Sequence, residues 1–232
     1  MVSKNQIKLI TSLQQKKYRK QEQLFFAEGV KVVQELLNSN FELQDLFTTK
    51  QDFLTVSKDK VHAISEAELK KISALTTPNT CLAVFKMPKS KDFVEKGLIV
   101  VLDDVRDPGN LGTIIRLCDW FGIETLFCSE ESVDIYNPKV VQATMGSISR
   151  VNVVYGNLEA FLTKTKLPVF GTFMDGKNIY QEKLPKEGII IMGNGANGIS
   201  SLVEKLVSER IAIPRFGNLQ VTESLNVATA TA

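Results

Sequence analysis

Histidine is nearly absent from this sequence, and cysteine is scarce. The 232 residues contain one histidine, His62, and three cysteines, none of which forms a C-x-x-C pair. A zinc site of cysteine and histidine ligands needs several such residues at close spacing, so we expect no metal. A hydrolytic triad built on histidine would have only His62 to use. The cysteines lie in apolar runs and indicate buried thiols in a reducing cytoplasm.

Long apolar runs are missing as well. No stretch approaches the ~18 apolar residues of a membrane span, and the N-terminus lacks the apolar core of a signal peptide. We therefore expect neither secretion nor a membrane partner. Hydrophobic residues still make up 44% of the chain and charged residues 23%, which is ordinary for a globular protein with a sizeable core. A disordered chain and a disulfide-bonded miniprotein are both excluded.

A strong net charge is the third feature that the chain lacks. The total is +2, but residues 1–95 hold 15 basic and 11 acidic side chains, while residues 96–232 hold 13 and 15. No acidic residue occurs among the first twenty, whose basic residues are Lys4, Lys8, Lys16, Lys17, Arg19 and Lys20. This asymmetry fits either a solvated terminal helix or a contact surface for a negatively charged partner.

Two regions of different regularity follow one another along the chain. In the first, short apolar runs predict strands at 24–27, 43–47, 60–64 and 81–85, and the residue pattern predicts helices at 5–22, 29–38 and 66–75. A charged stretch with proline and glycine, residues 86–97, separates the two regions. We therefore predict a small α/β domain at 1–88, a linker at 89–96 and a second domain at 97–232.

The second region alternates strands with helices. Strands are predicted at 98–102, 124–128, 151–154, 168–173, 188–192 and 210–213, and helices at 111–121, 138–149, 157–164 and 199–208. This alternation predicts a mainly parallel sheet that is covered on both faces. The fold class is α/β in both domains.

The first polar cluster, residues 103–110, follows a predicted strand and opens a helix. Ligands gather at the carboxyl ends of strands in such sheets. Asn110 suits the N-cap of this helix, and Gly122 suits its end. Arg116 shares one helix face with Gly112 and Trp120, away from a buried face that we expect to include Phe121. The arginine either serves a ligand or forms a surface ion pair with Asp119 one turn away.

The second cluster, residues 189–198, is an apolar strand followed by G-x-G-x-x-G. That pattern is also the fingerprint of a dinucleotide site. Its position argues against this interpretation, because such sites occupy the first strand–helix unit and only 34 residues follow Gly198. The glycines still indicate a tight turn or a close approach of the backbone to a ligand.

The third cluster lies near the C-terminus. A predicted strand ends at Pro214, a polar loop follows, and the segment from Ser224 to Asn226 opens a helix of small residues. Ser224, which lies next to Glu223, is suited to a simple capping role at this helix as well as to a ligand contact.

The ordered set of clusters resembles the SpoU/TrmH-type RNA ribose 2′-O-methyltransferases of the SPOUT superfamily. The matching segments are Asp107-Pro108-Gly109-Asn110-Leu111-Gly112 with Arg116, then 137–147, 193–199 and 213–227. Together they cover about 97–232. The opening segment, 16–29, looks like the accessory substrate-binding domain that many members carry.

The resemblance implies a trefoil knot in the C-terminal domain, a homodimer formed through that domain, and S-adenosylmethionine as methyl donor. By position, the donor would be lined by Thr172, Gly193, Ile213 and Leu225. Arg116 matches the catalytic arginine of the family, and it is accompanied by Asn110, Ser224 and Asn226. The implied substrate is structured RNA, with ribosomal RNA favoured over transfer RNA. Lys16, Lys17, Arg19 and Lys20 would then contact phosphates.

Two features depart from the family pattern. The second motif usually carries glutamate after its asparagine, and Gly195 stands there instead. The last helix stops at Ala232 without a capping signal, which leads us to expect a longer chain. Two alternatives to an active methyltransferase stay open at this point. One is an RNA-binding member with weakened catalysis, and the other is an oxidoreductase with a nucleotide cofactor bound at 193–198.

Overall fold

A computed structural model gives the fold of the chain and describes residues 1–50, 56–89, 93–219 and 224–232. The described chain divides into two compact units. The first unit is Met1–Ser90 with Asp134–Ser149, and the second is Lys91–Val133 with Arg150–Ala232. Residues 90–92 of the predicted linker and residues 220–223 of the third cluster lie outside the described residues.

The first unit is built on a four-stranded sheet in the order β1-β4-β2-β3. Its strands are β1 (Leu24–Glu28), β2 (Leu43–Thr48), β3 (Val61–Ala63) and β4 (Cys81–Lys86). β4 is antiparallel to both β1 and β2, and β3 runs parallel to β2. The helices are α1 (Lys4–Ser12), α2 (Lys16–Glu22), α3 (Val30–Leu37), η1 (Lys58–Lys60), α4 (Glu66–Ile72), α6 (Pro138–Thr144) and η2 (Ser147–Ser149).

Local sequence explains most of these boundaries. Capping boxes start α1 at Ser3 with Gln6 and α4 at Ser65 with Glu68, so two orphan backbone donors are satisfied at each start.

The core is strongly aromatic, and Phe25, Phe26, Phe47 and Phe85 are its largest fully buried rings. The strands at 24–27, 43–47, 60–64 and 81–85 are confirmed to within one or two residues.

The helix predicted at 5–22 is instead two helices, α1 and α2. The chain turns after Leu13, which is fully buried, and Gln15 takes an extended conformation before α2 begins. One straight helix would have rotated Leu13 and Arg19 to different faces, since six residues turn a helix by about 240°. The break lets both side chains enter the interior of the first unit.

Arg19 is a buried residue with a structural role. It is 2% exposed, and its Nη2 lies 2.6 Å from Oδ2 of Asp134. Its Nη1 donates hydrogen bonds to the carbonyls of Leu13 and Gln14, at 2.8 and 2.9 Å. The predicted phosphate contact is therefore wrong for Arg19, because its donors are used inside the protein. The other three residues of that prediction are the lysines of α2, and all three are exposed.

The second unit is a six-stranded sheet in the order β10-β8-β9-β5-β6-β7, with every pair parallel. The strands are β5 (Leu98–Leu102), β6 (Thr125–Ser129), β7 (Asn152–Gly156), β8 (Val169–Asn178), β9 (Gly188–Met192) and β10 (Glu209–Ala212). The helices are α5 (Pro108–Phe121), α7 (Leu158–Lys164), α8 (Ser201–Glu204) and α9 (Val227–Thr231). The predicted fold class, a small α/β domain followed by a parallel α/β sheet, is confirmed.

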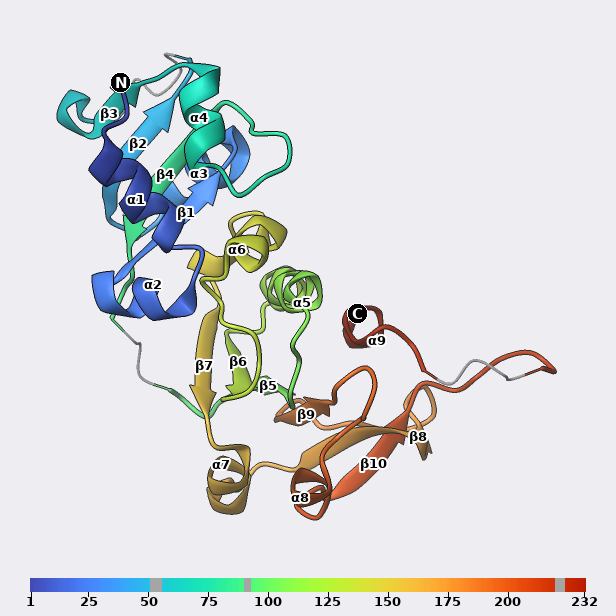
Figure 1. Ribbon diagram of the computed structural model, residues 1–232. Coiled ribbons are helices and arrows are strands. Elements are labelled where there is room, and N and C mark those ends of the chain that lie inside the picture. Colours follow the sequence, from blue (N-terminus) through green and yellow to red (C-terminus); the bar gives the residue numbers. More distant parts are fainter. Residues whose placement is uncertain (51–55, 90–92, 220–223) are drawn as a thin grey trace. The chain divides into compact units, whose positions relative to one another are not determined.

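Alternate residues of the central strands face opposite layers of the second unit. Ile99, Val101, Ile189 and Ile191 belong to one buried cluster, which also includes residues of α7 and α8. Figure 1 shows α5 and α9 together on the other side of this sheet. Both faces of β5 and β9 are thus covered, which explains why these strands are apolar at nearly every position.

Four predictions for the helices need correction. The helix predicted at 138–149 is α6 alone, because Met145 takes a left-handed conformation, and the short η2 follows it. α5 begins at Pro108 and its N-cap is Asp107, whose carboxylate accepts from the Asn110 backbone N–H, so Asn110 lies inside the first turn. Phe121 is 58% exposed rather than buried. The helix predicted at 199–208 is only α8, because Ser208 already joins the sheet through a hydrogen bond to the Val169 carbonyl. The predicted helix end at Gly122 is confirmed by its left-handed conformation.

The order of the strands reverses direction at one point of the sheet. β5 and β9 are neighbours, but the chain continues from β5 to β6 on one side and from β9 towards β10 on the other. Such a reversal opens a crevice outside the carboxyl ends of the two strands. The segments that follow β5 and β9 are residues 103–107 and 193–200, which contain the first two polar clusters. Among the described residues, no helix is long and apolar enough to cross a membrane.

The ion pair of Arg19 and Asp134 predicts a large effect on stability. In Arg19→Met, the Asp134 carboxylate is left without its cation, and we expect unfolding free energy to fall by about 3–5 kcal/mol. In Arg19→Met/Asp134→Leu, most of that loss should be recovered. Equilibrium urea unfolding measures both.

Lys20→Met is the matched control, since Lys20 is exposed on the same helix and its loss should cost less than about 0.5 kcal/mol. If Arg19→Met cost no more than this control, the ion pair would contribute nothing to the first unit.

Candidate active site

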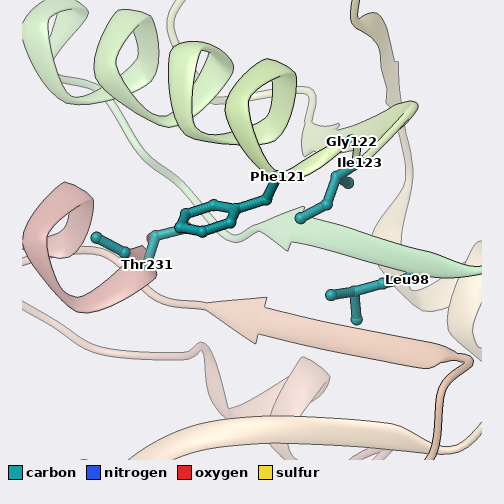
Figure 2. A pocket seen from close by; sticks show the side chains of 6 residues that line it. Leu98, Phe121, Gly122, Ile123 and Thr231 are labelled. Carbon is teal, nitrogen blue, oxygen red and sulfur yellow. The ribbon is translucent and has the colours of Figure 1, made fainter.

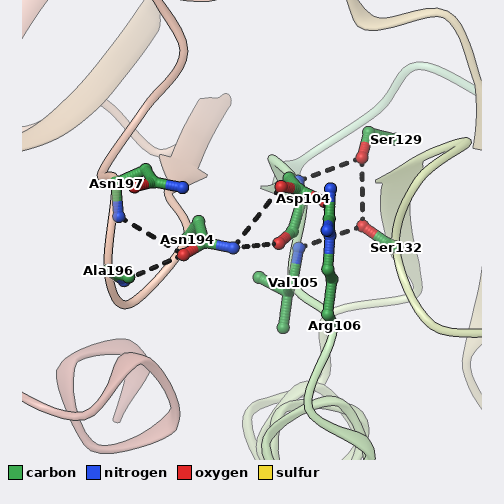
Figure 3. A network of polar contacts seen from close by, with 8 residues as sticks. All are labelled: Asp104, Val105, Arg106, Ser129, Ser132, Asn194, Ala196 and Asn197. Atoms are coloured by element: carbon green, nitrogen blue, oxygen red, sulfur yellow. Dashed lines mark hydrogen bonds and ion pairs between the residues drawn. The ribbon is translucent and has the colours of Figure 1, made fainter.

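Asp104 lies at the centre of a polar network that joins the loops after β5, β6 and β9 (Figure 3). Its backbone N–H donates to Oγ of Ser129 at 3.0 Å, and its carbonyl accepts from Nδ2 of Asn194 at 2.7 Å. Its carboxylate accepts from Nε of Arg106 at 2.6 Å, and this contact raises the pKa of the Arg106 guanidinium. Next to it, Val105 N–H donates to Oγ of Ser132 at 3.3 Å.

The loop after β9 is a tight and closed turn. Asn194 and Gly198 exchange two backbone hydrogen bonds, of 2.9 and 2.8 Å. A Cβ at Gly193 would come within 2.3 Å of the Gly198 backbone, so only glycine fits there. The buried carboxylate of Asp103 accepts from the Ser200 N–H at 2.7 Å and fixes the far end of the loop. The 193–198 segment is therefore a shaped backbone surface at the crevice.

The four residues predicted to line the methyl donor lie within or after the last three strands of the chain. Thr172 follows the last β8–β9 pair, Gly171–Ile191, and its Oγ1 donates to the Ile191 carbonyl at 2.9 Å. Gly193 directly follows β9. Ile213, just after β10, is 37% exposed, and Leu225, just before α9, is 51% exposed. These two apolar side chains leave surface free for a ligand.

Two of the predicted catalytic residues meet directly. Nδ2 of Asn226 donates to Oδ1 of Asn110 at 2.9 Å, although the two are 116 positions apart. The Oδ1 of Asn226 caps α9 by accepting from the N–H groups of Ala228 and Thr229. α9 thereby stands beside the start of α5. Ser224 is exposed two residues before this cap.

Arg116 is an exposed cation on α5. Within the described part of the chain it makes no hydrogen bond and no ion pair. The alternative pairing with Asp119 is not formed, because Asp119 accepts from Nε of Arg150 at 2.8 Å. Trp120, one turn further along the same face, is 83% exposed. This guanidinium is thus available to an anionic ligand.

The cysteines are unsuited to covalent catalysis. All three are free and buried. Burial raises the pKa of Cys118 to about 12, and burial together with Cys118 raises that of Cys128 further. The thiolate nucleophile is therefore scarce at neutral pH. Among the described residues, no three His, Cys, Asp or Glu side chains are grouped so that they could hold a metal ion.

A shallow apolar pocket of about 330 Å³ lies between the ends of α5 and α9 (Figure 2). It is lined by Leu98, Phe121, Gly122, Ile123, Thr231 and Ala232. The exposed Phe121 ring forms one wall, and Leu98, 38% exposed, forms another. This surface is hydrophobic and carries no chemistry of its own.

Comparison with known proteins assigns the chain to a family. Residues 97–232 match the SpoU rRNA Methylase family, and residues 4–83 match the MRM3-like substrate binding domain. A solved protein of the TrmH family from Porphyromonas gingivalis is 40% identical, with a TM-score of 0.90 over 100% of this chain and 95% of its own. An AdoMet-bound rRNA methyltransferase from Sinorhizobium meliloti is 28% identical, with a TM-score of 0.85 over 100% and 93%.

A curated relative spans nearly the same length. It is the 23S rRNA (guanosine(2553)-2′-O)-methyltransferase RlmP of Bacillus subtilis, 29% identical over 99% of this chain and 94% of its own. A parallel α/β sheet with polar loops after β5 and β9 is typical of proteins that bind a ligand at the strand ends, and the family match specifies which one this is. The chain belongs to the SpoU rRNA methylase family. The family that the motifs indicated is confirmed, and the chain is an RNA methyltransferase.

The dinucleotide interpretation of residues 193–198 finds no support in the geometry. A pyrophosphate site needs a helix that begins directly at the glycines. Here the glycines close a β-bridge, and the four-residue α8 begins only at Ser201.

Sequence reasoning did not assign roles to Asp103 and Asp104, nor to the side chain of Asn194. Their place at the ends of β5 and β9 was a usable signal. Their hydrogen-bond partners could not be predicted from the sequence, because these depend on which strands are neighbours in the sheet.

The contact between Asn226 and Asn110 predicts that capping and activity can be separated. Asn226→Asp keeps the oxygen that caps α9 but loses the N–H donor to Asn110. We expect unfolding free energy within about 0.5 kcal/mol of wild type and methyl transfer reduced about tenfold. Asn226→Ala, which also loses the cap, should cost about 1 kcal/mol of stability. Thermal unfolding and a methyl-transfer assay measure the two effects, and full activity in Asn226→Asp would contradict a role for the contact.

Proposed function

We propose that this chain transfers the methyl group of S-adenosylmethionine to the 2′-hydroxyl of a ribose in structured RNA, more specifically ribosomal RNA. The observation that carries the proposal is the arrangement of polar groups that follow β5 and β9. In a SpoU-family chain, the closed 193–198 turn follows β9, and the Asn110–Asn226 pair joins the starts of α5 and α9. Arg116 lies on α5 without a partner among the described residues. Ribosomal RNA is favoured over transfer RNA because the RlmP and S. meliloti relatives act on it.

The residues at the crevice fit S-adenosylmethionine. The exposed side chains of Ile213 and Leu225 suit an adenine ring, and the closed turn that begins at Gly193 offers backbone donors and acceptors. Thr172 and Gly193 would border the donor, as predicted from their positions in the motifs. When bound, the donor supplies a methyl group on a sulfonium, which is a strong electrophile.

The protein mainly positions the two reactants for this transfer. A C–O bond forms at the ribose oxygen as the C–S bond breaks, and the 2′-hydroxyl gives up its proton to solvent. Free guanidinium is always protonated, so Arg116 acts as a cation and not as a base. It orients the neighbouring phosphate and stabilises the forming alkoxide. Asn110, Asn226 and Ser224 are polar contacts for the ribose.

The N-terminal domain, 1–88, recognises the RNA, and the domain at 97–232 carries out the transfer, with 89–96 as linker. The matched segments 4–83 and 97–232 support this division. Lys16, Lys17 and Lys20 of α2 are exposed and would contact phosphates. Because Arg19 is buried among them, the basic surface is smaller than the sequence indicated.

A homodimer through the C-terminal domain accounts for the apolar surface around α5. Trp120, Phe121 and Leu98 are 83%, 58% and 38% exposed, and a monomer would leave them in water. A second copy of the chain covers them in this proposal.

The trefoil knot of the family is also part of the proposal. β10 is the edge strand beyond β8 and β9, yet α9 contacts α5, so the chain returns across the sheet after Ala212. That return supports a knotted path. The protein acts in the cytoplasm, with which its three free thiols agree.

One alternative is a member of the family that binds RNA but has weakened catalysis. The observation that favours it is Gly195, which lacks the usual carboxylate. Among the described residues, an added Cβ at this position would meet nothing within 4 Å, so a glutamate would fit. Transfer of tritiated methyl to unmodified ribosomal RNA decides the matter. Turnover by the wild type supports the enzyme, and turnover only by Gly195→Glu supports the weakened member.

The role of Arg116 predicts a specific loss. Arg116→Ala should reduce methyl transfer about 100–1,000-fold, because one preorganised cation at the developing charge is removed. The Kd for S-adenosylmethionine, measured by calorimetry, should stay within threefold of wild type. Arg116→Lys keeps the charge without the planar fork and should be intermediate. Wild-type turnover in Arg116→Ala would remove Arg116 from the mechanism.

The exposed lysines of α2 predict a change in salt dependence. Replacing Lys16, Lys17 and Lys20 by glutamine removes up to three phosphate contacts while Arg19 stays in place. We expect weaker RNA binding and a slope of log K against log salt that is shallower by about 2 to 3. Filter binding across salt concentrations gives the slope.

The control removes the same charge from exposed lysines of the second unit, Lys164, Lys166 and Lys183. Its slope should match wild type, and an equal change in both variants would mean that α2 holds no RNA.

A further inference from the structure

Asp104 has an unusual backbone conformation for its residue type. Its φ is +55°, in the left-handed region that non-glycine residues rarely occupy. It is one of four described non-glycine residues with positive φ. Strained residues persist where their surroundings over-determine them, and they gather at functional sites. The hydrogen bonds of Asp104 to Ser129 at the end of β6 and to Asn194 in the loop after β9 provide that surrounding structure.

The left-handed turn directs the Asp104 carbonyl towards Asn194. Nδ2 of Asn194 donates to this carbonyl at 2.7 Å, whereas its distance to the Asp104 carboxylate is 3.5 Å. The carbonyl is therefore the acceptor that holds Asn194. Figure 3 shows Asn194 between Asp104 on one side and its own loop on the other.

Asn194 passes this constraint to the loop. Its Oδ1 accepts from the N–H of Ala196 at 2.8 Å and from that of Asn197 at 3.3 Å. One side chain thus shapes the 194–197 turn and ties it to Asp104. At the other end of the loop, Asp103 holds the N–H of Ser200. The two consecutive residues after β5 therefore fix both ends of the segment.

The Asp104 carboxylate contributes little to this arrangement. Among the described residues its close partner is Arg106, at 2.6 Å, and the contact with Asn194 is long, at 3.5 Å. The Arg106 side chain is 70% exposed, and exposed ion pairs are weak. The conformation of residue 104 and its carboxylate are therefore separable by substitution.

We propose that Asp104 is a positioning residue for the methyl donor, and that its left-handed backbone, rather than its carboxylate, sets the shape of the 193–198 loop. The inference rests on the proposed function, in which that loop borders S-adenosylmethionine. Asp104 lies outside the residues predicted to line the donor, and in this proposal it positions the backbone of the loop that borders the donor.

The test compares three variants in the full chain. Asp104→Gly keeps left-handed φ at no cost and loses the carboxylate, so the Kd for S-adenosylmethionine should stay within threefold of wild type. Asp104→Val strongly disfavours that φ, and its Kd should rise on the order of tenfold. Arg106→Gln removes the partner of the carboxylate and should leave the Kd unchanged. Calorimetry gives the Kd, and the RNA affinity of each variant shows whether the effect is confined to the donor.

A double variant connects the effect to Asn194. With Asn194→Ala already present, Asp104→Val should weaken donor binding by much less than tenfold, because the bond between the loops is already lost. A merely structural role for Asp104 would lower thermal stability and RNA affinity together and would give additive effects. Equal donor affinity in Asp104→Val and wild type, or equal losses in the Gly and Val variants, would overturn the inference. Wild type that binds no donor would instead overturn the proposed function.

Discussion

The pairing of β5 with β9 is the interaction on which the catalytic part of this protein depends. The strands pair in register from Leu98–Gly188 to Leu102–Met192, so the chain leaves both at the same level. Asp103 and Asp104 then emerge beside the 193–200 loop and hold it at two points. A slip of one residue would turn every side chain of β9 to the other face and separate these partners. The crevice is thus a consequence of sheet register.

A second long-range contact completes the crevice. α9 follows β10 at the sheet edge, yet Asn226 bonds to Asn110 in the first turn of α5. The short helix has few residues to stabilise it, and its cap is the same side chain that makes this contact. Stability of the C-terminal segment and geometry of the site are therefore linked through one asparagine. By contrast, Arg116 is unpaired among the described residues, which suits a cation that meets its partner only when RNA is bound.

Much of this arrangement could be predicted from sequence because it is local. Short apolar runs predicted every described strand, although β8 continues five residues beyond its predicted end, and Gly122 marked the end of α5. The family resemblance rested on short motifs whose order is specific. Other features depend on contacts that no local pattern records. Arg19 looked like part of a basic surface, but the break between α1 and α2 turns it inward to Asp134. Asn110 looked like a cap, but Asp107 with Pro108 starts the helix earlier. The role of Asp104 could not be predicted either, because it depends on the φ of this residue and on the pairing of β5 with β9.

The proposed reaction is methylation of a ribose of ribosomal RNA at the ends of β5 and β9. It is tested most directly by mapping 2′-O-methylation across total RNA from a strain that lacks the gene, beside its parent. We expect one ribose in ribosomal RNA to lose its methyl group in that strain and to regain it when the wild-type gene, but not the Arg116→Ala variant, is restored. An unchanged methylation map would contradict the account, and a loss confined to transfer RNA would contradict its choice of substrate.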